Sequence, residues 1–336
     1  DVFIWRGHRT CHVSTLADLY GHDEFVTSWG GQISFMILDP WGPYGGEMLQ
    51  QTVAHEFNHT THAANDWHDL PISYEMSATY VEQMFGQDLS DYVADFQKYP
   101  DWGLLRNDDY QTWYMYGSAL YLHFLRDYYF AGEDFDLILP KIWVAMRNTP
   151  DLYENSPNFV DALNTFLQPK GVTFMDSVVD FARWRYYAGN RVAGDTMHFK
   201  RFPTVPWTPA ALLDGARLTI PAITLTSQTY AVSPAPMMTG TAYLTINRAN
   251  DAQASFRLQL VPATDNSIRW VAQAVPGMSA GSDGDLLDLS AGAVRIPFAA
   301  DGSRTLVLTA LPATAAGFDP NRQTAIRYPV SIKIDP

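Results

Sequence analysis

The segment Leu49–Thr61, LQQTVAHEFNHTT, constrains this chain most strongly, because residues 55–59 form an H-E-x-x-H motif. Residues four apart lie one above the other on a helix. Both histidines can therefore reach one metal ion if the segment is helical, and the glutamate beside the first can deprotonate a metal-bound water. The pattern predicts His55 and His59 as metal ligands and Glu56 as general base. An ordinary amphipathic helix, with its histidines in solvent or in a polar core, is the alternative.

A catalytic zinc site needs a third protein ligand and an open position. In one family pattern a glycine lies three residues and a histidine six residues after the second motif histidine. Those positions hold His62 and Asn65 here, so this pattern is not met. His62 falls on the motif face, where it is either a spare ligand or a second-shell or surface histidine.

A glutamate from a second helix fits the remaining requirement. The segment 63–71, AANDWHDLP, contains the helix breakers Asn, Asp and Pro, and a helical stretch follows over 72–82. In that stretch Glu75, Thr79 and Glu82 share one face. We expect Glu75 to be the third ligand, with Thr79 and Glu82 in the second shell and Glu82 orienting a ligand histidine. A solvated surface acid is the alternative for Glu75.

With these residues in place, the chain resembles the gluzincin metallopeptidases. The run E-x-x-x-x-Y-x-E at 75–82 is similar to the second-helix motif of the leukotriene-A4-hydrolase and aminopeptidase branch. The segment YMYGSAL at 114–120 is similar to that branch's Y-x-K-G-x-A-L segment, with Tyr116 in place of the lysine. Residues 50–205, which include FARW at 181–184, resemble secreted metalloproteases of the myxobacterial type.

The resemblance implies a zincin-like fold, one zinc ion per chain, and hydrolysis of peptide bonds in a peptide or protein substrate. It also implies a bacterial protein that is secreted, periplasmic or on the cell surface. Tyr114 falls on the tyrosine that hydrogen-bonds the tetrahedral intermediate, and Tyr116 takes that role if the register shifts. A zinc hydrolase of a non-peptide substrate, and a binding or adhesion protein with a vestigial zinc site, are the alternatives.

The resemblance also bears on how a peptide would be cleaved. The aminopeptidase branch carries a G-x-M-E-N loop for the free amine, and this sequence lacks one, so we expect an endopeptidase. A predicted strand at 32–38 precedes the zinc helix. It is either an edge to which an extended peptide adds as one more strand, or an ordinary half-buried strand.

The predicted fold class is α+β in two domains. Residues 1–202 form a mostly helical, zincin-like catalytic domain with a small N-terminal β-sheet, in which strands are expected at 2–5 and 32–38. A proline-rich linker at 203–209 opens the second domain, 203–336, which reads as an all-β sandwich. Further helices are expected at 119–125 (around a core His123), 135–146, 159–166 and 174–187. Sandwich strands are expected at 217–225, 241–247, 255–261, 268–275, 293–298, 305–311 and 325–334.

Charge and hydrophobicity exclude two classes of partner, nucleic acids and the interior of a membrane. The net charge of -14, from 36 acids and 22 bases, repels phosphate backbones, so no nucleic-acid partner is expected. No run of eighteen apolar residues is present, so no membrane span is expected.

The single cysteine, Cys11, is either a thiolate that caps the zinc or a partly buried thiol. The acidic run Asp283–Asp288 is either a calcium site or a plain acidic turn. The sequence carries no signature of oligomeric state.

Overall fold

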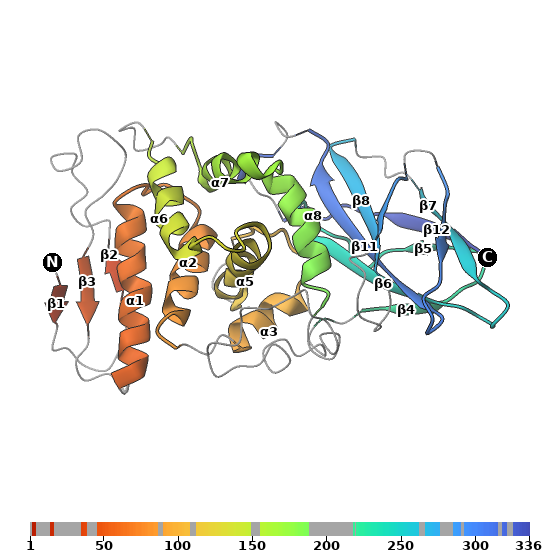
Figure 1. Ribbon diagram of the computed structural model, residues 1–336, viewed down its shortest axis with the longest axis horizontal. Helices are drawn as coiled ribbons and strands as arrows, with labels where there is room; N and C mark the ends of the chain where they lie inside the picture. The colour runs from red at the N-terminus through yellow and green to blue at the C-terminus, as the bar shows by residue number, and fades with distance from the viewer. Residues whose placement is uncertain are drawn as a thin grey trace. The chain divides into compact units, whose positions relative to one another are not determined.

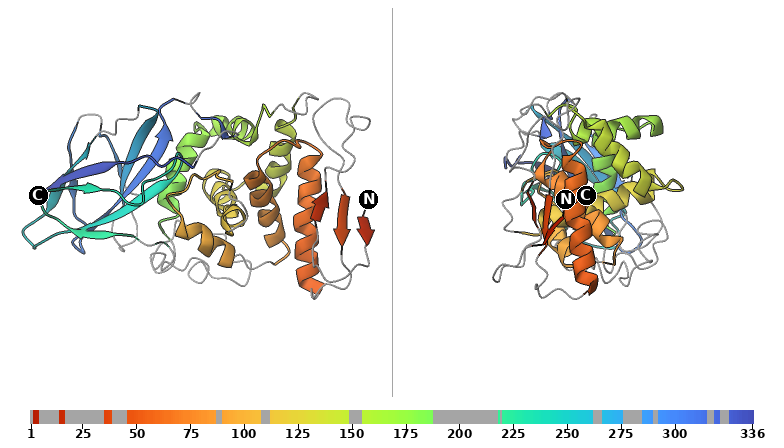
Figure 2. Two further views of the ribbon diagram at one scale, coloured as in Figure 1. Left: turned by 180° about the vertical axis from the view of Figure 1, so that it is seen from behind. Right: turned by 90° about the vertical axis from the view of Figure 1, so that its left-hand side faces the viewer.

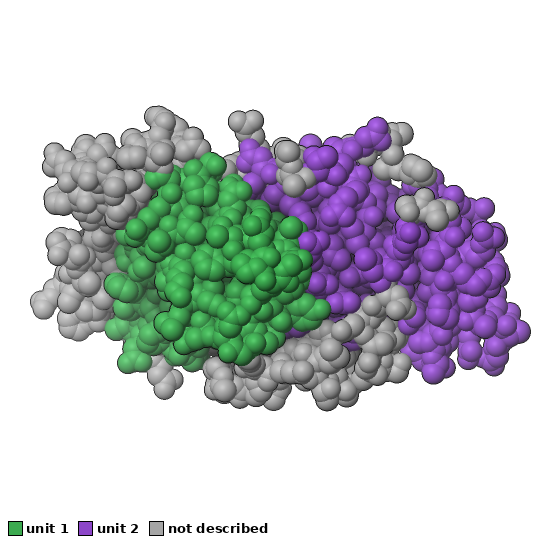
Figure 3. Space-filling model, turned by 45° about the horizontal axis from the view of Figure 1, so that its top comes forward, with its two compact units in different colours: residues 1–93, 107–174, 204–207 green, residues 94–106, 175–203, 208–336 purple. Residues whose placement is uncertain are grey.

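The computed structural model describes residues 2–4, 14–16, 35–38, 46–86, 90–107, 112–148, 155–187, 218, 220–261, 266–275, 285–289, 292–314, 318–320 and 325–336. Helix and strand are both well represented, in agreement with the predicted α+β class (Figure 1). The chain divides into two compact units (Figure 3). Unit 1 comprises residues 1–93, 107–174 and 204–207, and unit 2 comprises 94–106, 175–203 and 208–336.

Unit 1 begins with a small three-stranded sheet. Its strands are β1 (Val2–Ile4), β2 (Ser14–Leu16) and β3 (Phe35–Leu38), in the order β1-β3-β2. β3 pairs parallel with β1 and antiparallel with β2. Of the two alternatives for the strand before the metal helix, the edge is therefore wrong over Phe35–Leu38, because β3 is the central strand and both of its backbone edges are already paired.

Two helices carry the motif residues. Helix α1 (Gly46–Ala63) lies between the small sheet and α2 (Pro71–Gln83), as the views in Figures 1 and 2 agree. Pro71 occupies the first turn of α2, where its missing N–H costs nothing and its fixed φ suits the helix. Apolar residues such as Ile72, Met76 and Tyr80 are buried on α2 together with Glu75 and Glu82. α2 is thus an interior helix, which takes its two acids into the core.

The remaining described helices are α3 (Ser90–Lys98), α4 (Tyr114–Gly117), α5 (Ala119–Phe124), the π-helix η1 (Leu125–Tyr129), α6 (Phe135–Ala145), α7 (Phe159–Leu167), the 3-10 helix η2 (Gln168–Lys170) and α8 (Phe174–Trp184). Of these, α4 and α5 contact α2. Every residue of α5 is buried, including His123, as predicted for a core helix with a core histidine. Asn158 and Asp161 form a capping box that starts α7.

Most of unit 2 is a β-sandwich. One sheet has the order β10-β7-β12-β5 and the other β4-β6-β11-β8-β9. The strands are β4 (Ala222–Thr224), β5 (Gln228–Ala231), β6 (Thr241–Asn247), β7 (Ser255–Val261), β8 (Ile268–Val275), β9 (Asp285–Leu287), β10 (Val294–Pro297), β11 (Ser303–Pro312) and β12 (Ser331–Asp335). The predicted bounds of β6, β7 and β8 are confirmed, whereas β5 and β9 were not predicted.

The two sheets of the sandwich share one apolar core. Phe256, Leu258 and Ile332 come from the first sheet, and Leu244 and Leu306 from the second, and all belong to the same buried cluster. These residues alternate with more exposed ones along β7 and β12, as the period of two in a strand requires. The alternation is the signal that made the sandwich predictable from the sequence.

Unit 2 also contains segments from the half of the chain that was expected to be catalytic. Asp101 forms an ion pair with Arg327, and Leu104 donates its backbone N–H to Thr239 at 2.9 Å. Tyr243 donates its hydroxyl to the carbonyl oxygen of Ala182 in α8. The compact units therefore do not follow the expected division at residues 202/203, and that boundary itself lies outside the described residues.

Candidate metal centre

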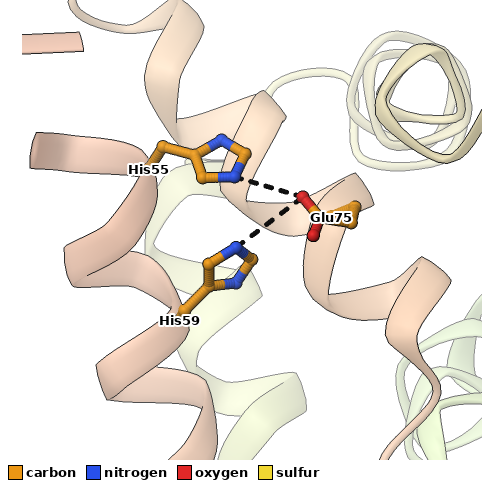
Figure 4. A group of neighbouring side chains, drawn as sticks. All are labelled: His55, His59 and Glu75. Carbon is orange, nitrogen blue, oxygen red and sulfur yellow. Dashed lines mark hydrogen bonds and ion pairs between the residues drawn. The ribbon is translucent and has the colours of Figure 1, made fainter. Parts of the chain in front are cut away.

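Three predicted ligands meet between α1 and α2. His55 and His59 extend from successive turns of α1 toward Glu75 on α2 (Figure 4). Oε2 of Glu75 lies 3.1 Å from Nε2 of His55 and 3.7 Å from Nε2 of His59. All three ligand atoms are within 4.8 Å of one another. Over the ranges that the structure describes, no other group of three or more His, Cys, Asp or Glu residues meets this condition.

The donor set and its spacing fit zinc. Ligand atoms on a tetrahedral zinc ion, with bonds of about 2.0–2.1 Å, are about 3.3 Å apart. The two separations from Glu75, 3.1 and 3.7 Å, bracket this value. Two imidazole nitrogens and one carboxylate oxygen form a common set for zinc, and three protein ligands leave one position open. His55, His59 and Glu75 therefore form a candidate metal-binding triad whose donors and spacing suit zinc.

The other ring nitrogen of His55 is also held by a carboxylate. Nδ1 lies 3.0 Å from Oε2 of Glu82, two turns after Glu75 on α2. Burial alone lowers the pKa of His55, but the hydrogen bonds and negative charges of Glu75 and Glu82 outweigh it and raise the pKa to about 10. Burial raises the pKa of Glu75, and its contacts with the two histidines outweigh that and lower the pKa to about 2. The imidazole of His55 on α1 thus lies between two carboxylates of α2.

Two further predicted residues flank the ligands. Glu56 directly follows His55 on α1, and its side chain is half-buried. It lies about 100° around the helix from His55, at the side of the ligand face. Thr79 occupies the predicted face of α2 and is fully buried, and its hydroxyl oxygen has no hydrogen-bond partner within the described part of the chain.

The two candidate tyrosines have different positions. The ring of Tyr116 stacks on His55, with centroids 5.8 Å apart and planes 19° from parallel, and it is partly exposed. Tyr114 lies on the same short helix, α4, but is fully buried. Tyr116 therefore contacts the candidate ligand His55, whereas Tyr114 lies in the core.

His62 belongs to a separate buried polar cluster. Its Nε2 lies 3.0 Å from Oδ2 of Asp69, and its ring stacks on Tyr74 with centroids 3.9 Å apart. Ser73 donates its hydroxyl to the same oxygen of Asp69. Burial lowers the pKa of His62 despite the charge of Asp69. The expectation of a surface histidine is wrong, since the side chain is wholly enclosed, and His62 is not among the three clustered ligands.

Sequence reasoning missed several residues of this cluster. Asn58, between the two ligand histidines, donates its amide to Oγ of Ser77 on α2 at 3.0 Å. Ser77 Oγ also lies 3.5 Å from Nδ1 of His62. Asp66 accepts a hydrogen bond from Asn148 at 3.1 Å, and burial and the charge of Asp69 raise its pKa to about 8. The four-residue spacing of Asn58 and His62 was the available signal, because it placed both on one helix face.

Two weaker predictions fall wholly or partly outside the described residues. Cys11 lies outside them, so both alternatives for it, a partly buried thiol and a thiolate that caps the zinc, stay predictions. Asp283 in the acidic run is also outside them, while the following residues Asp285–Leu287 form strand β9. In the described part of that run, no group of acids meets the spacing for a metal ion.

Two further findings concern membrane spans and similarity to known proteins. No helix in the described parts of the chain is long and apolar enough to cross a membrane. Neither the protein-family models nor the curated proteins that were compared with this sequence give a match.

Proposed function

We propose that this protein is a zinc-dependent hydrolase that cleaves peptide bonds, with a gluzincin-type site in a zincin-like unit. One observation carries the proposal: His55 and His59 from one helix and Glu75 from the next converge within 4.8 Å, with Glu56 beside the first histidine. Two neutral imidazoles and one carboxylate leave a net positive charge on a bound zinc ion. That balance suits a catalytic centre better than a purely structural one.

Glu56 and Glu82 each have a definite task in the proposed reaction. When bound, zinc supplies Lewis acidity that acidifies water and polarises a carbonyl group. Glu56 accepts the proton of the attacking water and delivers it to the leaving amine. Glu82 holds Nδ1 of His55 at 3.0 Å, which fixes the ring so that Nε2 faces the ligand position.

Tyr116 is the better candidate for the residue that stabilises the reacting carbonyl oxygen. Its ring stacks on His55, whereas Tyr114 is enclosed in the core. A single well-placed donor to a developing oxyanion typically contributes about 10²–10³-fold in rate. The substitution Tyr116→Phe keeps the ring and removes only the hydroxyl, so it isolates this contribution.

Cleavage inside a polypeptide is the preferred mode. The loop that binds a free amine in the aminopeptidase branch has no counterpart in the sequence. Because β3 is the central strand of its sheet, an added substrate strand on β3 is not part of the proposal. We assign the protein to the outside of the cytoplasm, as a secreted, periplasmic or surface protein, on its family resemblance alone.

A digest of labelled casein tests the proposal. The full chain, loaded with one equivalent of zinc, should release labelled peptides, lose the activity with a chelator and regain it when zinc is restored. A parallel peptide with a free or an acetylated N-terminus distinguishes the cleavage modes, since an endopeptidase cuts both. Stepwise release of single residues that requires the free amine would contradict the endopeptidase assignment. Zinc-dependent cleavage of ester substrates without peptide cleavage would point to the non-peptide alternative.

A further inference from the structure

Three aromatic side chains form a closed triangle next to the candidate metal centre. The ring centroids of Tyr92 and Trp113 are 5.1 Å apart, those of Tyr92 and Tyr116 are 5.4 Å apart, and those of Trp113 and Tyr116 are 5.3 Å apart. Tyr116 stacks in turn on the imidazole of His55. The aromatic cluster, as we call Tyr92, Trp113 and Tyr116, therefore contacts a ligand residue directly.

The aromatic cluster is not a closed part of the core. Trp113 is 49% exposed, and Tyr92 and Tyr116 are half-buried. By contrast, Tyr114 and Tyr121 on the adjoining helical turns are fully buried. Single exposed apolar residues are common and have no meaning by themselves. Here the exposed ring belongs to a group of three that reaches a candidate metal-ligand residue, which places an apolar surface beside the candidate metal centre.

We propose that the aromatic cluster is a subsite that receives an aromatic or large aliphatic side chain of a polypeptide substrate, beside the bond that is cleaved. This inference rests on the proposed peptidase function and adds a substrate preference to it. Successive Cα atoms of a polypeptide are 3.8 Å apart. A residue that flanks a carbonyl held at the ligand histidines therefore lies within side-chain reach of Tyr116, the ring of the cluster that stacks on His55.

The chemistry of the cluster favours an apolar occupant. Aromatic rings bind another ring through offset-stacked or edge-to-face contacts and bind aliphatic groups by excluding water. A lysine or arginine side chain could lie over a ring face. However, burying such a cation among the rings removes part of its hydration, which opposes its binding. A small side chain would leave the rings in water.

Two zinc-binding hydroxamates that differ only in a benzyl or a methyl side chain test the subsite without requiring turnover. Their dissociation constants are measured by titration calorimetry on the full chain loaded with zinc. We expect the benzyl compound to bind about tenfold more tightly, the size of one good aromatic contact. In Trp113→Ala this preference should fall to about twofold at unchanged zinc content. Trp113→Phe should keep most of it, because a ring remains.

A matched control is Tyr128→Ala, which removes a partly exposed aromatic ring outside the cluster and should leave the preference unchanged. Equal binding of the two hydroxamates to the parent protein, or a preference that survives in Trp113→Ala, would overturn the subsite. Tighter binding of an aminobutyl analogue than of the benzyl compound would overturn its apolar character. In each of these cases zinc and hydroxamate still bind, so the metal centre stands. Failure to bind zinc or any hydroxamate would instead overturn the proposed function, and the subsite with it.

Discussion

Oε2 of Glu82 lies 3.0 Å from Nδ1 of His55, on the opposite side of the imidazole from Glu75. One carboxylate of α2 thus faces each nitrogen of the ring. His59 differs, because its Nδ1 is buried without a hydrogen-bond partner in the described part of the chain. The two candidate ligand histidines are therefore held unequally, and His55 is the one whose ring orientation is fixed by a partner on its second nitrogen.

This relationship predicts the effect of neutralising Glu82. Glu82→Gln keeps the length of the side chain but removes its negative charge, so it should weaken zinc binding by about 10–100-fold. A competition titration against a chromophoric chelator measures the change. Glu133→Gln, the same change at an exposed acid paired with Lys170, is the control and should leave the affinity within about twofold. An unchanged affinity in Glu82→Gln would show that Glu82 does not support the ligand.

Removal of a ligand should remove the metal. His59→Ala deletes one of the three donors, and we expect no zinc to remain after dialysis, as measured by elemental analysis, against one ion per parent chain. His62→Gln is the matched variant, one turn further along α1. It should retain zinc but melt at a lower temperature, because it disrupts the buried pair with Asp69. Full zinc occupancy in His59→Ala would refute the ligand assignment.

The general base can be separated from the ligands. Glu56→Gln should keep one zinc ion and lose turnover by at least about 10²–10⁴-fold, since the change removes the proton acceptor alone. Casein cleavage and zinc content are measured on the same sample. Glu133→Gln alters an exposed acid paired with Lys170 and serves as the control. If Glu56→Gln stays fully active, the reaction uses another base.

Stability should depend on pH through Asp66. Its folded-state pKa of about 8 lies above its ordinary value of 3.8, chiefly because of burial. Between these values the unfolded chain has lost the proton and the folded chain keeps it. The free energy of unfolding therefore falls as pH rises through this window, by up to about 1.4 kcal/mol per pH unit. Asp66→Asn removes the effect, so its stability relative to the parent should increase from pH 5 to pH 8.

Urea unfolding of both proteins at several pH values measures this difference. Asp134→Asn, at an exposed position before α6, should show no such gain. If the difference between Asp66→Asn and the parent stays constant from pH 5 to pH 8, Asp66 does not hold its proton in the folded state.

Unit 2 combines a helical segment with the sandwich, and this predicts how the chain tolerates truncation. Ala182 and Tyr186 share a buried cluster with Tyr243, Val275 and Val307 of the sandwich. A chain that ends near residue 201 would expose the helical side of this cluster, so we expect it to be insoluble or to unfold without cooperativity. Size-exclusion chromatography and thermal unfolding test this. A soluble, cooperatively folded fragment would show that the helical part is independent.

A milder substitution examines the same junction. Tyr243→Phe removes only the hydroxyl that donates to Ala182, and should lower the free energy of unfolding by about 1 kcal/mol. Tyr230→Phe, at a half-buried tyrosine on β5, is the control and should change it much less.

Local periodicity made several features predictable. A four-residue spacing in a helix brings His55 and His59 together whatever surrounds them, because it depends only on the helix itself. Glu75 and Glu82 share a face of the next helix for the same reason, because seven residues make about two turns. Strand β7 alternates between buried and exposed residues within its predicted bounds. Each of these is a property of a single helix or strand, so it follows from the local order of residues alone.

Relationships between elements were decided only by the tertiary structure. No local pattern could place β3 at the centre of its sheet, enclose His62 with Asp69, or choose Tyr116 over Tyr114 as the neighbour of His55. Each depends on how segments distant in sequence pack, and packing is set by the whole core, because an element buries whichever face its neighbours cover. The sequence therefore determined which residues could act together on one helix, and the fold decided which partners each of them met.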